Sequence, residues 1–308
     1  MAEPKAEQSA SSPIQIDEEL RELGLEPHIL DLELKGVTVV PPEVHGVGMD
    51  EIDQMVELIL DQAKVLTGCE FDLEKGPLAP LKFPVDREAG LSTLSPEQAG
   101  EPSQFLIQQL GRLHRAFRDL ALNRVAVALI GHMIGEDMRF SSHNTFVKWQ
   151  GDYGYGANLG LHADQGRLPR PWGGTAMTAN TNWCLTDYTL EGGSFACVPG
   201  SNRAVRHPDF PNAVRGAVPI ECPKGSCIVF HGTTWHGAFP RKIPGMRLSV
   251  ANYYRHEAVA SQEDFHGTFP QELADDCDNP ELFKKLAGFA DKFPYATQTQ
   301  PIPTVVSG

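Results

Sequence analysis

Three residue types that bind transition metals, together with one cation, stand at a spacing that indicates a metal centre. His162 and Asp164 are separated by one residue, His236 lies far downstream, and Arg247 follows it by 11 positions. Two histidines and one carboxylate are the protein ligands of a facial triad, which holds Fe(II) on one face and leaves the opposite positions open. In an extended segment His162 and Asp164 point to the same side. Because Arg247 can reach the far carboxylate of a dicarboxylic co-substrate, the set predicts an oxygenase.

His231 is the alternative for the distal ligand, because it precedes His236 by five residues. It ends the hydrophobic run 226–230, and Arg247 would then follow the ligand by 16 positions, which fits the pattern less well. A lone histidine is more often a satisfied core or surface residue than a ligand. We therefore interpret His231 as structural or as a neighbour of the site.

Composition limits the classes of protein and of partner. The chain has 308 residues, 41% hydrophobic residues and a net charge of −14, which is typical of an ordinary globular protein with a sizeable core. An acidic surface repels nucleic acid and anionic membranes, so we expect neither as a partner. We find no apolar run of the roughly 20 residues that a membrane span requires. Residues 1–13 lack an apolar segment, which predicts a flexible leader rather than a secretory signal.

The six cysteines, at positions 69, 184, 197, 222, 227 and 277, form no C-x-x-C pair. We expect reduced thiols and a cytoplasmic location, where ferrous iron is also stable. Cys222 and Cys227 have a spacing that zinc sites use, but no second pair completes four ligands. Buried small hydrophobic residues are the better interpretation.

The first third of the chain has helical periodicity. Apolar residues recur at helical spacing over 51–67, with Asp50 as the expected N-cap. A second helical region is predicted from about residue 95 through Phe105, Leu106 and Phe117, continuing or restarting over 120–133. Residues 72–94, rich in proline, glycine and charge, are predicted to be a loop.

From about residue 138 the pattern changes to short β-like runs separated by glycine and proline. The predicted strands are residues 142–149, 178–185, 193–198, 226–231 and 246–254. Short strands with turn signals between them favour a sandwich or barrel with helices packed outside it. A last helix is predicted over 280–289, ahead of a polar tail.

Short motifs run in a characteristic order from about residue 37 to about residue 256. They are Gly36-Val-Thr-Val-Val-Pro, Leu129-Ile-Gly-His-Met-Ile-Gly, Leu161-His-Ala-Asp, Trp183-Cys-Leu-Thr-Asp, Val198-Pro-Gly-Ser, Gly225-Ser-Cys-Ile-Val-Phe-His and Trp235-His-Gly with Arg247. In their order and spacing the chain resembles the phytanoyl-CoA dioxygenase family of Fe(II)- and 2-oxoglutarate-dependent oxygenases. The resemblance implies a mainly β fold with flanking helices around a double-stranded β-helix, a cupin-like jelly-roll core.

The resemblance also implies a division of the chain. We expect a leader over residues 1–15, one oxygenase domain over 16–295 and a tail over 296–308. Within the domain, a helical part covers about 16–137, the jelly-roll core about 138–258 and a C-terminal helix about 278–292.

Roles for individual residues follow from the resemblance. It implies that His162, Asp164 and His236 bind Fe(II) and that Arg247 binds the distal carboxylate of 2-oxoglutarate, to which a guanidinium can form two parallel hydrogen bonds. Trp183 stands where the family often places an aromatic residue beside the co-substrate. In related halogenases Ala or Gly replaces the ligand carboxylate, whereas Asp164 retains it. The implied reaction is hydroxylation of an aliphatic C–H with O2, with release of succinate and CO2; desaturation and ring chemistry are alternatives.

One residue departs from the family pattern. Ala238 stands where a serine frequently follows the ligand histidine by two positions. We expect the missing hydroxyl contact with 2-oxoglutarate to come from Thr233, Thr234 or Asn144.

Substrate contacts are predicted in the segment after the metal-binding step. Residues 165–174 are basic and rich in proline and glycine, and a loop in this place can cover an active site. Arg167 and Arg170 are candidates for an anionic substrate group, and Trp172 for its apolar part. His143, on the first core strand, faces either the pocket or the helices. The alternative is a solvated loop.

Two other classes of function compete with the hydroxylase. One is a jelly-roll metal-binding or sensor protein without catalysis, which would not need an anchor such as Arg247. The other is a zinc-dependent hydrolase, since two histidines and an aspartate also suit zinc, but no H-E-x-x-H motif supplies a general base. The sequence indicates a small-molecule substrate, and it leaves open the substrate's identity, the residues that bind the C1 carboxylate of 2-oxoglutarate and the oligomeric state.

Overall fold

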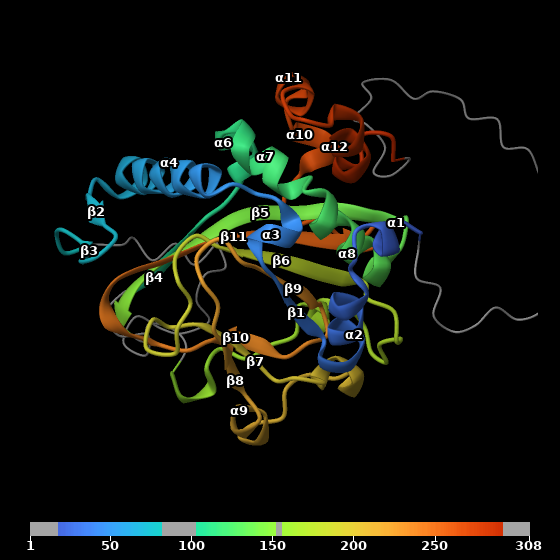
Figure 1. Ribbon diagram of the computed structural model, residues 1–308, viewed down its shortest axis with the longest axis horizontal. Coiled ribbons are helices and arrows are strands. Elements are labelled where there is room, and N and C mark those ends of the chain that lie inside the picture. The colour runs from blue at the N-terminus through green and yellow to red at the C-terminus, as the bar shows by residue number, and fades with distance from the viewer. Residues whose placement is uncertain (1–17, 82–102, 152–155, 292–308) are drawn as a thin grey trace, which may run out of the picture.

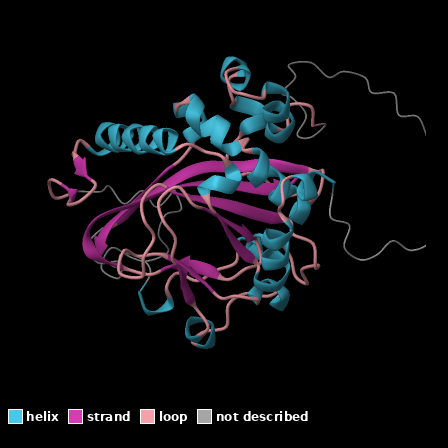
Figure 2. Cartoon of the chain, in the orientation of Figure 1, coloured by secondary structure: helices cyan, strands magenta, loops and turns pink. Residues whose placement is uncertain are grey.

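The computed structural model describes residues 18–81, 103–151 and 156–291. Its strands form two main antiparallel sheets and a small hairpin (Figures 1 and 2). The large sheet has the order β1-β9-β6-β11-β5-β4 and the small sheet the order β10-β7-β8. The strands are β1 Val37–Val40, β2 Phe71–Asp72, β3 Gly76–Pro77, β4 Gln104–Ile107, β5 Met138–Gly151, β6 Thr178–Cys184, β7 Phe195–Cys197, β8 Val218–Ile220, β9 Cys227–His231, β10 His236–Ala238 and β11 Arg241–His256.

Helices cover the face of the large sheet that points away from the small sheet (Figure 1). Apolar residues of α4, α8 and α12 share one buried core with residues of β5, β6 and β11. The helices are α1 Glu18–Glu22, α2 Glu26–Lys35, α3 Pro42–His45, α4 Met49–Thr67, α6 Leu110–Leu113, α7 Arg115–Ala121, α8 Arg124–Ile134, α9 Asn212–Arg215, α10 Phe265–Thr268, α11 Gln271–Asp275 and α12 Pro280–Ala287. The mainly β jelly-roll core with flanking helices is therefore confirmed.

Period-two alternation divides the central strands between two environments. Trp183 and Val250 point into the core beneath the helices, while Asn182 and Ala251 point toward the small sheet and line a cavity. The five strands predicted from the sequence are all present, as are the helices over 51–67 and 280–289, with ends shifted by a few residues.

Two local predictions are wrong. Residues Gln104–Ile107 form strand β4 rather than part of a helix, because they pair with the edge of β5 over residues 145–148; this tertiary pairing outweighs local preference. Helix α4 begins at Met49 with Gly48 as its N-cap, so Asp50 is inside the first turn. The Glu51 carboxylate accepts the backbone N–H of Gly48 at 3.3 Å, which satisfies one of the free donors at that end.

The predicted leader and tail lie outside the described residues. Residues 82–94 of the predicted loop also lie outside them, and at the start of that loop Phe71–Asp72 and Gly76–Pro77 pair as a hairpin.

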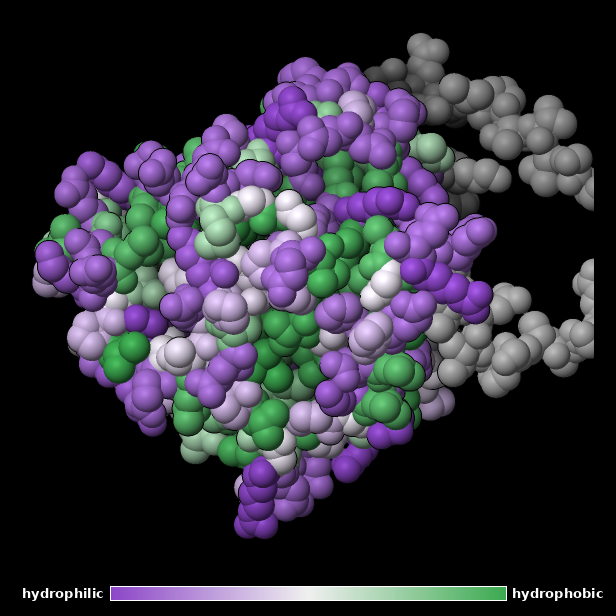
Figure 3. Space-filling view, viewed as in Figure 1, coloured by the Kyte–Doolittle hydropathy of each residue, from purple (hydrophilic) through white to green (hydrophobic). Residues whose placement is uncertain are grey.

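Within the described residues, no helix is both long and apolar enough to cross a membrane. All six cysteines are free and buried. In space-filling view, polar side chains cover the C-terminal helices at the top, and apolar side chains gather near the centre of the visible face (Figure 3).

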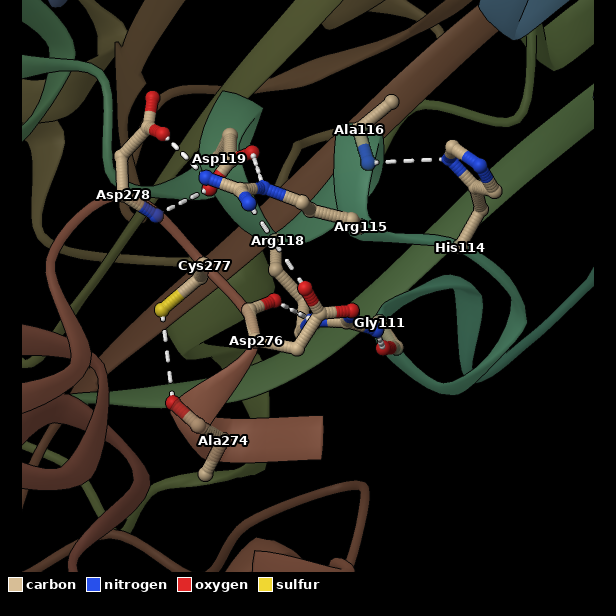
Figure 4. A network of polar contacts seen from close by, with 10 residues as sticks. All are labelled: Gly111, His114, Arg115, Ala116, Arg118, Asp119, Ala274, Asp276, Cys277 and Asp278. Atoms are coloured by element: carbon tan, nitrogen blue, oxygen red, sulfur yellow. Dashed lines mark hydrogen bonds and ion pairs between the residues drawn. The ribbon is translucent and has the colours of Figure 1, made fainter. Parts of the chain in front are cut away.

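A buried arginine attaches the C-terminal helices to α7. Arg118 is 1% exposed and donates to the carbonyl oxygens of Gly111 and Asp276, at 2.7 and 2.9 Å, and to the Asp276 carboxylate at 2.6 Å. Arg115 lies beside it and binds Asp119 and Asp278 (Figure 4). Because the guanidinium of Arg118 is buried and each of its three nitrogens donates a hydrogen bond, this network fixes α11 and α12 against the helical layer.

Glu263 connects two elements close to the cavity. Its carboxylate accepts the backbone N–H groups of Gln109, just before α6, and of His143 on β5, both at 3.0 Å. Burial raises the pKa of Glu263 to about 7, although these two hydrogen bonds act in the opposite direction. The folded protein therefore holds a proton on Glu263 at a pH where an unfolded glutamate, with a pKa of about 4.3, has lost it.

We predict that Glu263→Gln changes how stability depends on pH. Between about pH 4.5 and 7 the folded wild type binds more protons at this site than the unfolded chain, so its free energy of unfolding falls as pH rises through that window. The glutamine keeps an acceptor oxygen and removes the titration. Urea unfolding at pH 5 and pH 8 should show the variant gaining stability relative to wild type at the higher pH. Glu281→Gln, at an exposed carboxylate of α12, is the control; an equal gain in both variants would contradict the prediction.

Candidate active site

Backbone pairing brings the two candidate ligand histidines together. His162 and His236 form an isolated antiparallel bridge, each donating its N–H to the other's carbonyl oxygen at 2.9 Å. Asp164 then begins a single 3-10 turn, Asp164–Arg167, so the H-x-D step lies at a bridge and a turn rather than in a long strand. Its carboxylate oxygens lie 3.3 Å from His162 Nε2 and 3.5 Å from His236 Nε2. Within the described residues this is the one group of three or more such side chains close enough to hold a metal ion.

The orientation of both imidazole rings suits metal binding. Nδ1 of His162 lies 2.8 Å from the carbonyl oxygen of Gly160, and Nδ1 of His236 lies 3.0 Å from that of Thr234. A carbonyl oxygen can only accept, so each Nδ1 carries a proton and each Nε2 is the atom left for a metal. Burial lowers the pKa of His236 to about 4 despite the nearby Asp164. At His162 burial also acts to lower the pKa, but the hydrogen bond and charge of Asp164 outweigh it and raise the pKa. The donor set consists of two imidazoles and one carboxylate, which fits a divalent first-row metal.

Asn180, on β6, orients the carboxylate ligand. Its side-chain amide donates to Oδ2 of Asp164. Burial alone would raise the pKa of Asp164, but the two histidines and this hydrogen bond hold it below its ordinary value. Partners of this kind fix the rotamer of a metal ligand and tune its basicity. Sequence reasoning missed Asn180, although its place on the cavity side of a predicted strand was a usable signal.

The glycine of the Trp235-His236-Gly237 motif is required by close packing of the backbone. A Cβ at position 237 would lie 2.1 Å from the carbonyl oxygen of Leu159. Ala238 N–H donates to that same oxygen at 3.0 Å, so the segment before His162 is pressed against β10. Trp235 itself is structural, since its indole N–H donates to the carbonyl oxygen of Arg206 at 2.7 Å.

A cavity of about 260 Å³ extends from the triad between the two sheets. His162, Asp164 and His236 line one part of it, and Arg247 lines another. Arg247 is 5% exposed, donates from Nη1 to the carbonyl oxygen of Gly193 at 2.6 Å, and has its guanidinium carbon 5.1 Å from the centre of the Tyr188 ring. Its Nε is buried without a hydrogen-bond partner among the described residues. A buried guanidinium with an unused donor fits a carboxylate ligand.

Two hydroxyl groups near Arg247 were not predicted. Tyr188 lines the cavity, and its phenol oxygen accepts a hydrogen bond from Asn182 at 3.1 Å, which leaves its own proton free to donate. Burial raises the pKa of Tyr188 to about 12, against the effect of Arg247, so the phenol stays neutral. Ser249 lies two residues after Arg247, on the same face of β11, and its buried hydroxyl is beside the phenol of Tyr188. Side chains alternate between the two faces of a strand, so the two-residue distance from Arg247 was the signal in the sequence that could have identified Ser249.

The structure does not support the threonines as replacements for the missing hydroxyl at Ala238. The Thr234 hydroxyl donates to the carbonyl oxygen of Gly36 at 2.8 Å, and Thr233 donates to that of Asn202 at 2.9 Å. Neither lines the cavity, whereas Asn144 does. The expectation for Thr233 and Thr234 is therefore wrong, because both hydroxyls are used to anchor the turn before His236.

Two further predicted site residues point away from the cavity. Trp183 is fully buried in the core beneath the helices, with its ring edge-on to His45 at 4.8 Å between centroids. His143 is also fully buried on that side, 4.5 Å from the Phe140 ring and 5.1 Å from the Phe265 ring. The predictions that Trp183 contacts the co-substrate and that His143 contacts the substrate are wrong. Along their strands, Trp183 and His143 occupy the alternate positions whose side chains face the helices.

Residues 165–174, which follow Asp164, contribute less to the cavity than predicted. Trp172 is buried in a separate apolar cluster with Trp235, and its indole N–H donates to the carbonyl oxygen of Leu168 at 3.1 Å. Arg167 and Arg170 are exposed, and neither lines the cavity. His231 is also outside the cavity, with Nδ1 2.7 Å from the Thr233 hydroxyl, in agreement with a structural role.

Comparison with known proteins gives the family. The family model "Phytanoyl-CoA dioxygenase (PhyH)" matches residues 93–249, just over half of the chain. The chain belongs to the phytanoyl-CoA dioxygenase family of Fe(II)- and 2-oxoglutarate-dependent oxygenases. Enzymes of this family use iron as cofactor and 2-oxoglutarate as co-substrate.

Relatives of known sequence are distant. Dioxygenase af480 of Aspergillus fumigatus is 28% identical over 201 residues, which cover 64% of this chain and 63% of that protein. An uncharacterized protein of Mycobacterium tuberculosis is 30% identical over 98 residues, which cover 32% of this chain and 36% of that protein. The chain thus spans less than two thirds of either relative.

Solved structures share the fold. HygX from Streptomyces hygroscopicus, solved with nickel and 2-oxoglutarate bound, superposes with a TM-score of 0.53 at 14% identity and covers 77% of this chain and 88% of its own. The non-heme alpha-ketoglutarate-dependent epimerase SnoN from nogalamycin biosynthesis gives 0.51 at 19% identity, covering 76% and 83%. At these identities the likeness shows the jelly-roll fold alone.

We predict that Asn180→Ala weakens metal binding without unfolding the protein. Loss of the amide frees the Asp164 carboxylate to leave its ligating rotamer, and changes to such partners typically cost about 10- to 100-fold in metal affinity. Anaerobic titration with Fe(II) followed by competition with a chelator measures the effect. Thr181→Val, at the neighbouring residue that faces the helices, is the matched control. Equal affinities of Asn180→Ala and wild type would show that Asp164 needs no such partner.

Proposed function

We propose that the protein hydroxylates an aliphatic C–H bond of a small molecule, coupled to conversion of 2-oxoglutarate and O2 to succinate and CO2. The observation that supports the proposal most strongly is that the metal-ligating side chains and a buried arginine line the same cavity. Three metal-ligating side chains line one part of it, and a buried arginine with an unused Nε lines another. A sensor or storage protein would gain nothing from a buried cation at that position, because an unpaired buried charge is costly.

Each role in the proposed reaction falls to a residue already placed by the fold. His162, Asp164 and His236 would hold the ion from one side, which directs its open positions toward the cavity. When bound, iron and 2-oxoglutarate supply the oxidising chemistry that breaks the C–H bond. Arg247 would bind the distal carboxylate of the co-substrate, and the neutral phenol of Tyr188 and the Ser249 hydroxyl would each donate one hydrogen bond to it. In this proposal Ser249 replaces the hydroxyl that Ala238 lacks.

The retained ligand carboxylate favours hydroxylation over halogenation. Asp164 occupies the position that a halide would need, and Asn180 holds it there. A small molecule is the class of substrate that we infer. SnoN and HygX, which share this fold, have been crystallised with nogalamycin RO and hygromycin B respectively. A zinc-dependent hydrolase has no comparable support, since the residues lining the cavity offer no further carboxylate as a general base.

We expect the anaerobic complex with Fe(II) and 2-oxoglutarate to show a visible charge-transfer band that needs both additions. Arg247→Ala should weaken 2-oxoglutarate binding by about 30-fold or more, since truncating one partner of a buried charge pair costs about 2–5 kcal/mol. Asp164→Ala should weaken the band by loss of metal. Lys242→Ala, an exposed cation on the same strand, is the control. A folded, metal-loaded wild type without a band would favour a metal-binding module without oxygenase activity.

Ser249→Ala should raise the dissociation constant of 2-oxoglutarate, read from the same band, by about 5- to 10-fold. This corresponds to loss of one hydrogen bond with a net value of about 1–1.5 kcal/mol. Because Ser249 is next to Arg247 on its face of β11 and is not among the residues that line the triad end of the cavity, the affinity for Fe(II) alone should not change. A change in Fe(II) affinity with unchanged 2-oxoglutarate affinity would assign Ser249 to the metal end instead.

A further inference from the structure

One wall of the cavity is used neither by the triad nor by the residues around Arg247. It consists of Leu106, Asn144, Phe146, Ala251, Tyr253 and Gln262, which come from β4, β5, β11 and the segment after β11. We call this set the distal wall. Its apolar members are two large side chains and one small one, and its polar members are two amides and a phenol. None of its residues carries a formal charge at neutral pH, so it lacks the counter-charge that an anionic or cationic substrate group would need.

A bulge in β5 places the amide of Gln262 at the cavity. The register of β5 against β11 skips Ser141, since Tyr253 pairs with Ser142 and Tyr254 pairs with Phe140. The carbonyl oxygen of Ser141 is thereby available to accept the backbone N–H groups of Gln262 and Glu263, at 3.1 and 2.8 Å. Bulges are common beside active sites because they redirect a side chain in this manner.

A single hydroxyl connects the two amides. Ser142 Oγ donates to Gln262 Oε1 at 2.7 Å and accepts from Asn144 Nδ2 at 3.2 Å. The serine has one proton, so it donates to one amide and accepts from the other. The other end of each amide forms no hydrogen bond with a described residue. Asn144 Oδ1 is buried without a partner, whereas Gln262 is exposed, so its Nε2 lies where solvent and the cavity meet.

The two amides of the distal wall therefore offer one buried acceptor and one donor, beside the phenol of Tyr253 and the apolar side chains of Leu106 and Phe146. An unpaired buried acceptor is unfavourable until a ligand supplies a proton to it. A carboxylate has no proton for Asn144 Oδ1, and an ammonium has no lone pair for Gln262 Nε2. A carboxamide, lactam or alcohol both donates and accepts, and so satisfies the two groups at once.

We propose that the substrate is a neutral molecule with a compact apolar skeleton that carries a carboxamide, lactam or hydroxyl group. Asn144 Oδ1 accepts a hydrogen bond from that group and Gln262 Nε2 donates one to it, while Leu106 and Phe146 contact the skeleton. The residues that set specificity thus lie on the distal wall and not in the basic loop that contains Arg167 and Arg170. This inference rests on the proposed function, because the distal wall receives a substrate only if the triad and Arg247 hold iron and 2-oxoglutarate.

Two probes of nearly equal shape test the proposal. Cyclohexanecarboxamide and cyclohexanecarboxylate are titrated into the anaerobic complex with Fe(II) and 2-oxoglutarate, and the change in its charge-transfer band gives each affinity. We expect wild type to bind the carboxamide at least about 10-fold more tightly than the carboxylate, because a site built to hydrogen-bond a group strongly rejects the analogue that leaves it unpaired. Asn144→Leu and Gln262→Leu, both close in volume to the wild-type residue, should each reduce that preference by about 5-fold or more.

The control is Thr145→Val, on the same strand as Asn144 but on the face toward the helices. It should leave the preference for the carboxamide unchanged. Methylcyclohexane, which can form no hydrogen bond, should bind the two leucine variants as well as or better than wild type.

The possible outcomes separate this inference from the proposed function. If no band forms with iron and 2-oxoglutarate, the proposed function fails before any probe is added. If the band forms but the carboxamide produces no change up to its solubility limit, or the two probes bind equally, the inference about the distal wall is overturned and the oxygenase stands. A preference that persists in both leucine variants would likewise overturn the assignment of Asn144 and Gln262.

Discussion

The register of β11 between its two neighbours determines which side chains of the central strands face the cavity. This strand pairs with β5 on one side and with β6 on the other, so the central residues of β11 have a defined partner in each neighbouring strand. Arg247, Ala251 and Tyr253 face the cavity because they share one parity, and Leu248 and Val250 face the helical core because they share the other. A shift by one residue would exchange the two sets. The apolar core beneath the helices therefore stabilises the register that also positions the arginine.

The two ends of the cavity have complementary chemistry. The carboxylate of Asp164 and two imidazoles suit a cation, and the guanidinium of Arg247 suits an anion. A dicarboxylic co-substrate that chelates the metal at one end and meets the arginine at the other satisfies both without leaving a buried charge unpaired. The distal wall has no charged residue, which separates recognition of the co-substrate from recognition of the substrate.

The supporting contacts are of two kinds. Backbone pairing of residue 162 with residue 236 brings the ligands into contact, and carbonyl oxygens of Gly160 and Thr234 set the tautomer of both histidines. Arg118 attaches the C-terminal helices to α7, and Glu263 attaches the turn before α6 to β5. The chain thus uses hydrogen bonds to backbone atoms to hold side chains and segments that must stay in one position.

The sequence by itself determined the residue types of the metal centre, the candidate arginine and most strands, because chemistry that depends on ligand identity and on period-two patterning is local. It did not determine which face of the sheet a side chain occupies. Trp183 and His143 were plausible site residues until the register placed them under the helices, and Asn180 and Tyr188 were unremarkable until the fold placed them at the cavity. Strand β4 and the bulge at Ser141 were equally invisible, since β4 exists through pairing with β5 and the bulge through pairing of β5 with β11. Only tertiary structure decides such features, because they depend on contacts between segments that local sequence does not bring together.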